Sequence, residues 1–318
     1  MSKRMKTILV WVGAAILGFA LIQIAILTGW ITRYYEMTLM LILINIMLAV
    51  GLNLIVGISG QLSLGHAGFM AIGAYTTGIV TKMMPNLGGF ALGILGGVVL
   101  SGIVAYIVGI PTLRLKGDYL AIATLGVGEI IRITILNLDI TNGARGLSGI
   151  PKLATWYYAY IVALLIILVA ANYVNSSPGR ATISVREDEI AAESLGINTK
   201  KYKMIAFMIG TMTAAVAGSF HATYYQLIVP SQFDFVRSID ILIMVVLGGM
   251  GSLTGSIFAA VFLGLLNHFL ADYGAFRVIL YAIALILVMI FKPSGLFGRK
   301  EIKASKLFNW KKKEASRS

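Results

Sequence analysis

The chain contains 318 residues, of which 58% are hydrophobic and only 12% are charged. Soluble domains carry roughly 25% charged residues, so this composition excludes a soluble protein and predicts an all-α polytopic membrane protein. The absence of cysteine excludes disulfides, thiolate metal sites and cysteine nucleophiles, and the three histidines are scattered without the spacing of metal ligands. We therefore expect no metal site in this chain.

Apolar runs near twenty residues long, the length that crosses a bilayer as a helix, follow one another along the chain. We predict about ten transmembrane helices, some of them broken. Their residue ranges are 8–28, 37–58, a third run ending near 80, 89–110, 119–138, 156–174, 204–228, two runs within 239–270, and 276–291. We assign residues 1–298 to a transmembrane domain with a cytoplasmic loop at 175–203, and residues 299–318 to a basic cytoplasmic tail.

The basic residues predict the orientation in the membrane. If both termini are cytoplasmic, 19 of the 26 lysines and arginines lie in inner segments, six lie in outer segments, and Arg132 lies within a span. Cytoplasmic segments carry an excess of these residues, so this orientation is favoured. The net charge of +13 then reflects topology signals and contacts with the lipid bilayer, and it does not require nucleic acid.

Two glycine-rich segments interrupt the apolar pattern, at 59–68 and at 248–255. The motif Gly-x-x-Ser-Leu occurs in both, at 60–64 and at 249–253. Paired broken segments in the two halves of a transporter often mark the transport path. The alternative is a chance match, because glycine and leucine are abundant here.

A charged segment at 184–198 stands between long apolar runs. Ser184 and Glu187 have the Ser-x-x-Glu spacing of a capping box, and Gly196 stands where a left-handed cap would end a helix. These signals predict one helix of about eleven residues, which is too short to be stable alone in water.

The least polar face of this helix contains Ala191, Ala192 and Leu195. A short helix with such a shallow face suits a groove on another protein. The alternative is a solvated connector between two spans.

Polar side chains also occur inside the apolar runs. Glu129 and Arg132 are three residues apart on one face of a predicted helix, and charges at membrane depth need a partner or a polar interior. We interpret them as a mutual ion pair, or alternatively as a gate or a contact with a second membrane subunit.

Gln61, Ser63 and His66 are candidates to line a path at the first glycine-rich segment. The alternative for His66 is a hydrogen-bonded interior histidine. Gln61, like Asn45 and Asn53, is alternatively an interhelical hydrogen-bonding residue.

The predicted outer loop at 141–151 is rich in turn-forming residues and carries one charge. It is either a compact surface turn or a docking site for an extracytoplasmic partner, with Asn142 and Arg145 as the candidate contacts.

The chain has no nucleotide-binding Gly-x-x-x-x-Gly-Lys-Ser/Thr motif, no His-Glu-x-x-His motif and no nucleophile elbow. We therefore predict that it is not an enzyme and carries no cofactor. If transport uses ATP, another chain must hydrolyse it.

Several stretches occur together in a familiar order. They are Gly51-Leu-Asn-Leu-Ile-Val-Gly57 with Gly60-Gln-Leu-Ser-Leu-Gly-His-Ala-Gly-Phe69, Gly117-Asp-Tyr-Leu-Ala-Ile-Ala-Thr-Leu-Gly126 with Glu129-Ile-Ile-Arg132, Thr141-Asn-Gly143 through Gly149-Ile-Pro151, Gly179-Arg180 through Gly196-Ile-Asn198, and Lys292-Pro-Ser-Gly-Leu-Phe-Gly298. With these stretches the chain resembles the LivM-type permease subunits of high-affinity branched-chain amino-acid ABC importers, over about residues 37–298.

The resemblance implies an ABC importer permease fold in a bacterial plasma (inner) membrane. It also implies three kinds of protein partner: a second permease subunit that shares the path, two cytoplasmic ATPase subunits, and an extracytoplasmic binding protein that delivers leucine, isoleucine or valine. Permeases for urea, short amides, sugars or nucleosides share the plan and remain alternatives, as does a stand-alone secondary carrier.

The resemblance further implies a role for the charged segment. It is similar to the coupling loop that ABC importers insert into the ATPase, whose pattern is Glu-Ala-Ala-x-x-x-Gly. Ala191, Ala192 and Gly196 fit that pattern. Ile190 occupies the glutamate position, however, and Glu189 stands one residue early, so the role of Glu189 stays open.

Overall fold

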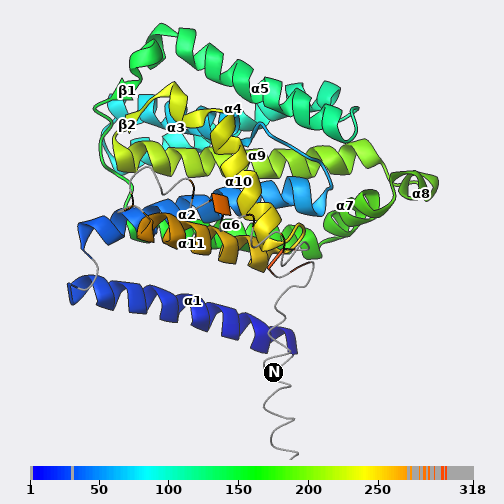
Figure 1. Ribbon diagram of the computed structural model, residues 1–318, viewed down its shortest axis with the longest axis horizontal. Coiled ribbons are helices and arrows are strands. Elements are labelled where there is room, and N and C mark those ends of the chain that lie inside the picture. Colours follow the sequence, from blue (N-terminus) through cyan, green and yellow to red (C-terminus); the bar gives the residue numbers. More distant parts are fainter. Residues whose placement is uncertain are drawn as a thin grey trace, which may run out of the picture.

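The computed structural model describes residues 3–29 and 32–270, together with a few single positions between 273 and 298. Helices make up almost all of it (Figure 1). The α-helices are α1 Lys3–Leu27, α2 Arg33–Asn53, α3 His66–Met83, α4 Leu87–Thr112, α5 Asp118–Asn137, α6 Trp156–Asn175, α7 Ser177–Glu187, α8 Glu189–Ser194, α9 Thr199–Tyr225, α10 Phe235–Gly248 and α11 Leu253–Phe269. The short elements are the π-helix η1 Leu54–Ile58, the 3-10 helices η2 Asp139–Thr141, η3 Gly143–Arg145 and η4 Pro230–Phe233, and the strands β1 Leu147–Ser148 and β2 Leu227–Ile228.

Within the described part of the chain, five helical segments are long and apolar enough to cross a membrane. They are Arg33–Ile58, Leu87–Thr112, Asp118–Asn137, Trp156–Asn175 and Thr199–Tyr225, and two shorter apolar segments are Ile16–Leu27 and Leu253–Phe269. Each predicted apolar run up to residue 270 coincides with a helix. The predicted run at 276–291, apart from single positions, and the tail at 299–318 lie outside the described residues.

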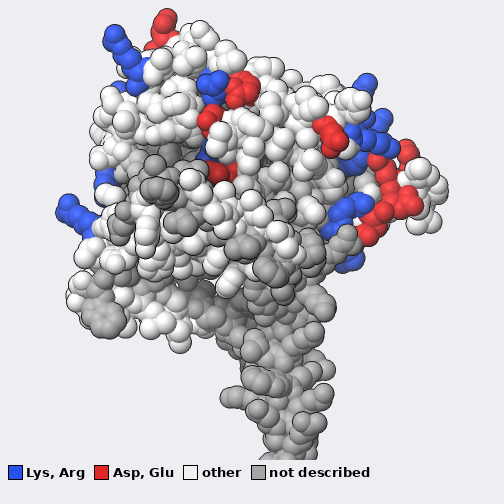
Figure 2. Space-filling view, viewed as in Figure 1, with Lys and Arg blue, Asp and Glu red and all other residues white. Residues whose placement is uncertain are grey.

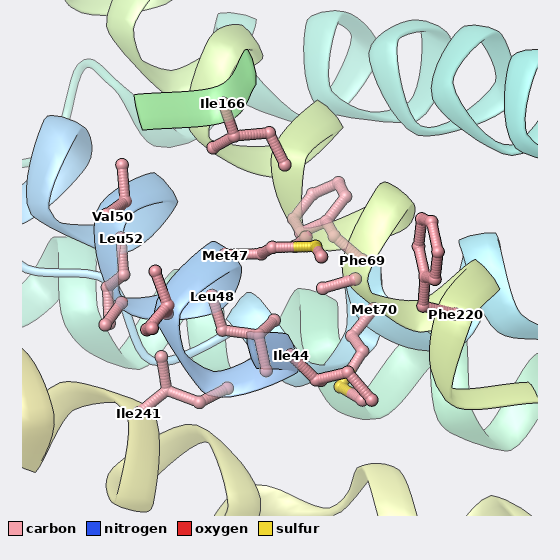
Figure 3. Close-up of a cluster of buried hydrophobic side chains, with 14 of the residues drawn as sticks. Ile44, Met47, Leu48, Val50, Leu52, Phe69, Met70, Ile166, Phe220 and Ile241 are labelled. Atoms are coloured by element: carbon pink, nitrogen blue, oxygen red, sulfur yellow. The ribbon is translucent and has the colours of Figure 1, made fainter. Parts of the chain in front are cut away.

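Helix α2 is the most enclosed of these segments. Its apolar window is 89% buried, whereas those of α4 and α6 are each 28% buried. Figure 3 shows the core around it, where Met47 and Leu48 of α2 lie beside Phe69 and Met70 of α3. Helices α4 and α6 instead direct many apolar side chains outward, as helices that contact lipid tails do.

Helices α3 and α9 approach closely because glycines stand at their contact. A Cβ atom at Gly73 would lie 1.9 Å from the carbonyl oxygen of Ala215, and one at Gly218 would lie 1.9 Å from that of Met70. Small residues are what allow helix backbones to meet in a membrane. Helices α3 and α9 therefore pack backbone against backbone at this crossing.

Both glycine-rich segments interrupt helices as the sequence predicts. The first break, residues 59–65, separates η1 from α3, and the second break, residues 249–252, separates α10 from α11. Gly60, Gly249 and Gly251 have φ angles of +71°, +109° and +92°, which residues with a side chain rarely adopt. The glycines therefore allow the chain to leave one helix and enter the next.

The prediction of one helix at 184–198 is wrong. The segment forms the end of α7 and then α8, and Asp188 between them is extended, with φ −153° and ψ 109°. Ser184 lies inside α7, where its hydroxyl donates to the carbonyl of Ala181, so the capping box with Glu187 does not form. The Asp188 carboxylate caps α8 instead, accepting hydrogen bonds from the amides of Ile190 and Ala191.

The structure also contains a small sheet that the sequence did not predict. Strand β1 pairs antiparallel with β2, with Leu147 opposite Ile228 and Ser148 opposite Leu227. Strands of two residues are too short to show the alternation that identifies a strand in a sequence. The sheet fastens the loop at 138–155 to the end of α9.

Candidate functional site

Helices α7 and α8 stand at one end of the bundle, opposite the end that carries β1 and β2 (Figure 1). Figure 2 shows lysine, arginine, aspartate and glutamate gathered on this end, whereas much of the remaining surface in this view is uncharged. This α7–α8 end contains the candidate coupling residues.

Some apolar residues of α8 and of its C-cap, Leu195, are exposed to solvent, and one is buried. Ile190 and Leu195 are 75% and 82% exposed, and Ala191 is exposed beside them. Ala192 is only 3% exposed, because it packs against its own chain. The exposed apolar face of α8, called here the α8 patch, therefore consists of Ile190, Ala191 and Leu195, and the expectation that Ala192 belongs to it is corrected.

The end of α8 has the geometry of a Schellman cap. The amide of Ile197 donates to the carbonyl of Ala192, and that of Gly196 donates to Glu193. Gly196 has a φ angle of +81°, so the predicted left-handed cap is confirmed. This cap holds Leu195 in its exposed position.

Glu189 points toward its own chain. Its carboxylate lies 2.7 Å from the Lys203 ammonium at the start of α9 and 3.2 Å from that of Lys116 in the loop between α4 and α5. Burial raises the pKa of the Glu189 carboxyl, but the hydrogen bonds and charges of Lys203 and Lys116 outweigh it and lower that pKa overall. Glu189 therefore ties α8 to two other segments.

Two further residues at this end make long-range hydrogen bonds. The Arg186 guanidinium of α7 donates to the carbonyl of Gly57 in η1 over 2.6 Å, and Asn53, fully buried at the end of α2, bonds to the backbone of the second break. Arg186 was not singled out by the sequence. Asn53 makes hydrogen bonds between helical segments, as one interpretation of the sequence predicted, but no local pattern identified its partners.

The predicted path candidates lie in the first break and at the start of α3, and all of them are buried. Gln61 donates to the carbonyl of Lys203 over 3.0 Å and also to the hydroxyl of Ser59, so it joins the first break to α9. Ser63 and His66 are 3% and 1% exposed. The His66 ring interacts with the backbone of Leu48 in α2, and no side chain among the described residues hydrogen-bonds to it.

Glu129 and Arg132 form the predicted ion pair, with a separation of 2.7 Å between Arg132 Nη2 and Glu129 Oε2. Their side chains are about a quarter exposed, at 28% and 27%. A pocket beside the pair lies between α5, the start of α3 and the start of α10. Its lining residues are Leu64, Gly68, Leu125, Gly128, Glu129, Phe233, Asp234, Phe235 and Ser238.

The candidate docking loop lies at the β1–β2 end. Asn142 has a φ angle of +65° and is exposed, and Arg145 is exposed three residues later. The sheet and the amide of Gln226, which donates to the Ile150 carbonyl, hold this loop on the end of α9. Among the described residues, no group of histidine, aspartate or glutamate side chains has metal-site geometry.

Comparison with known proteins identifies a family. Residues 34–291 match the family described as the permease component of branched-chain amino acid transport systems. The chain is 37% identical to the high-affinity branched-chain amino acid transport system permease protein LivM of Salmonella typhimurium, over 80% of this chain and 68% of that protein. It is also 26% identical to the permease protein LivH of Escherichia coli, over 80% of this chain and 92% of that protein. No solved structure matches the chain.

Proposed function

Because the chain belongs to the family of permease components of branched-chain amino acid transport systems, we propose that it forms a path for leucine, isoleucine and valine together with a second permease subunit, driven by two ATPase subunits. Members of this family are transport permeases and not enzymes. The likeness to both LivM and LivH supports a path built from two related permeases.

The proposed orientation has about ten spans and both termini in the cytoplasm. Its support is that long-range contacts join segments assigned to the same side. Glu189 pairs with Lys116 and Lys203, all in segments assigned to the inside. At the opposite end, the Lys152 ammonium lies 4.7 Å from the ring centroid of Tyr224, where both segments are assigned to the outside.

This orientation is tested by labelling, because the chain has no native cysteine. Arg145→Cys should react with a membrane-impermeant thiol reagent added to intact cells, whereas Lys200→Cys should react only after the membrane is opened. Both positions are exposed, so a difference reports the side of the membrane. Labelling of position 200 in intact cells would overturn the orientation.

The single observation that carries the ATPase-driven function is the α8 patch. The patch exposes apolar side chains on a capped six-residue helix at the charged end of the bundle. Removing these side chains from water is favourable, and an apolar helix face of this kind fits a groove on another protein. We therefore propose that the α8 patch docks in the ATPase subunit, with Gly196 shaping the exit from α8 and Glu189 holding α8 to its own chain.

Charge placed on the α8 patch tests the docking. Ile190→Glu and Leu195→Glu should leave the chain in the membrane but abolish retention of the ATPase and ATP-dependent uptake. Ser194→Glu is the matched control, since it places the same carboxylate on an exposed polar position of α8. Normal retention and uptake by both patch variants would reduce α8 to a connector.

We propose that the face containing Glu129 and Arg132 contacts the second permease subunit. Its support is a partly exposed ion pair beside a pocket between α5 and α10. Glu129→Gln leaves the Arg132 charge unpaired, so it should reduce assembly more than the double change Glu129→Gln with Arg132→Met. If the double variant is no better than the worse single variant, pairing is not what retains these residues, and the gate becomes the better explanation.

We also propose that Asn142 and Arg145 contact the extracytoplasmic binding protein. The support is their exposure on a loop that β1 and β2 hold in place. Arg145→Glu should weaken binding-protein-stimulated ATP hydrolysis while basal hydrolysis by the complex stays unchanged. An unaltered stimulation would make this loop a surface turn.

A further inference from the structure

A buried side chain at the end of α2 is bonded to the second break, and α2 leads through η1 into the first break. Asn53 Nδ2 donates to the Ser252 carbonyl over 2.9 Å, and its Oδ1 accepts from the Gly251 amide over 2.9 Å. These bonds run to the backbone of the second break and do not depend on the side chains there. Because Asn53 is fully buried, moving the second break away from the end of α2 would leave its amide without partners, which is costly.

Arg186 of α7 contacts the end of η1, which leads into the first break. Its Nη1 atom donates over 2.6 Å to the carbonyl of Gly57, 129 residues earlier in the chain. The last carbonyls of a helix have no partner inside the helix, and η1 ends one residue after Gly57. The Arg186 side chain is 18% exposed, and it also pairs with Glu187.

Three glycines make a slot for this guanidinium. A Cβ atom at Gly60 would lie 2.7 Å from Arg186 Cγ, and one at Gly251 would lie 2.9 Å from Arg186 Nη1. A Cβ atom at Gly57 would lie 2.3 Å from the Gly251 amide nitrogen. Arg186 therefore lies between the two breaks, in contact with both.

Arg186 is also close in the chain to the α8 patch. Only Asp188 separates α7 from α8, and Arg186 stands two residues before it. Asp188 caps α8 through its carboxylate, so α8 cannot shift far without moving the end of α7. A displacement of α8 is thereby passed to the guanidinium over a very short length of chain.

The breaks are suited to respond to such a displacement. Their glycines absorb backbone changes, and π-helical turns such as η1 are frequent at functional sites. We propose that Arg186 is a positioning residue that links movement of α8 to the two breaks, holding them together when it is seated and releasing them when α8 is drawn away. This inference rests on the proposed docking of α8 with an ATPase subunit.

The test uses the complete importer, reconstituted in lipid vesicles with its ATPase subunits, second permease and binding protein. Arg186→Gln removes the charged donor to Gly57. The expected result is normal retention of the ATPase and basal ATP hydrolysis, with ATP-dependent leucine uptake about tenfold lower or more, because a charged hydrogen bond corresponds to at least one tenfold step. Arg186→Lys keeps the charge and the stem, and should restore part of the uptake.

Arg180→Gln is the matched control. Arg180 lies on the same helix and donates to the Asn175 carbonyl over 3.0 Å, away from both breaks. It should transport as the unaltered chain does. If Arg186→Gln does not accumulate, Arg186→Lys serves in its place and should show reduced uptake with full ATPase retention.

Two outcomes would overturn the inference. Normal uptake by Arg186→Gln would show that the contact transmits nothing, and parallel loss of ATPase retention and uptake would make Arg186 a structural or docking residue. Failure of the proposed function is distinguishable, because in that case the unaltered chain would not retain an ATPase or the charged α8 variants would retain it.

Discussion

At the α7–α8 end of the bundle, side chains fasten segments that are far apart in the sequence, whereas at the β1–β2 end backbone pairing does so. Glu189 links three segments through Lys116 and Lys203. At the opposite end, Leu147 and Ile228 are register partners in a two-stranded sheet. A long charged side chain tolerates small shifts of the segments it joins, but a strand ladder fixes both spacing and register.

This difference indicates which substitutions and conditions should alter the stability of each end. The α7–α8 end should depend on charge and on pH, and the β1–β2 end on backbone conformation. An end that docks with a moving partner benefits from contacts that can adjust, while an end that presents a fixed loop benefits from a rigid one. Four measurements sharpen or break the comparison.

The largest effect is expected from glycine at the β1–β2 end. Gly146 and Gly149 have nearly equal φ angles, +71° and +72°, but a Cβ atom at Gly146 would lie 2.2 Å from the Ile228 carbonyl oxygen and one at Gly149 would meet nothing. Gly149→Ala should cost about 1–2 kcal/mol for the left-handed conformation. Gly146→Ala should cost about 1–3 kcal/mol more, for the clash. Thermal unfolding of the purified chain in detergent measures both, and equal shifts would contradict the close approach.

The second effect concerns Glu189. Glu189→Ala leaves the Lys203 ammonium, whose side chain is 12% exposed, without its carboxylate. Losing a hydrogen bond between charged groups costs about 1.5–3 kcal/mol. We expect the free energy of local opening of α8 to fall by this amount, which is measured as faster amide hydrogen exchange in α8. Glu193→Ala, at an exposed position of the same helix, should change the free energy of local opening of α8 by no more than about 0.5 kcal/mol. Equal effects of the two would show that Glu189 does not hold α8.

The third prediction follows from the lowered pKa of Glu189. A carboxyl whose pKa is lowered by folding contributes stability above its unfolded pKa, about 4.3, and loses it as the pH falls through the lower folded pKa. Amide exchange in α8 should therefore accelerate on acidification below about pH 4.3, and this step should be smaller in Glu189→Gln. The β1–β2 end, with no such carboxylate contact described, serves as the internal reference. If acidification accelerates amide exchange in Glu189→Gln as much as in the unaltered chain, another titrating group causes the acceleration.

The smallest effect is expected from Lys152, whose ammonium lies over the ring of Tyr224. Exposed contacts of this kind are worth about 0.5–1 kcal/mol. Lys152→Met should lower the thermal midpoint slightly, and Lys200→Met, an exposed lysine at the other end, should leave it unchanged. A drop as large as that of Gly146→Ala would mean that a side chain, and not the sheet, fastens the β1–β2 end.

Much of the site was visible in the sequence because it rests on local patterns. The Glu129–Arg132 pair is a contact between residues three apart on one helix, so spacing alone predicted it. The left-handed position of Gly196 follows from glycine at the end of a helical segment. The prediction of one helix at 184–198 was wrong, because α7 already begins at Ser177 with Ser176 as its cap. Ser184 is therefore inside a helix, and Asp188 caps the next one.

What the sequence by itself determined is the class of molecule and its local elements: the membrane spans follow from apolar runs, the breaks from glycine, and the family from its motifs. Only the tertiary structure decided which side of α8 is free, turning Ala192 inward and leaving Ile190 and Leu195 exposed. It alone placed Arg186 on Gly57 and Asn53 on the second break. These contacts join residues more than a hundred positions apart, and no period or spacing along a chain encodes which distant backbone group a long polar side chain will meet.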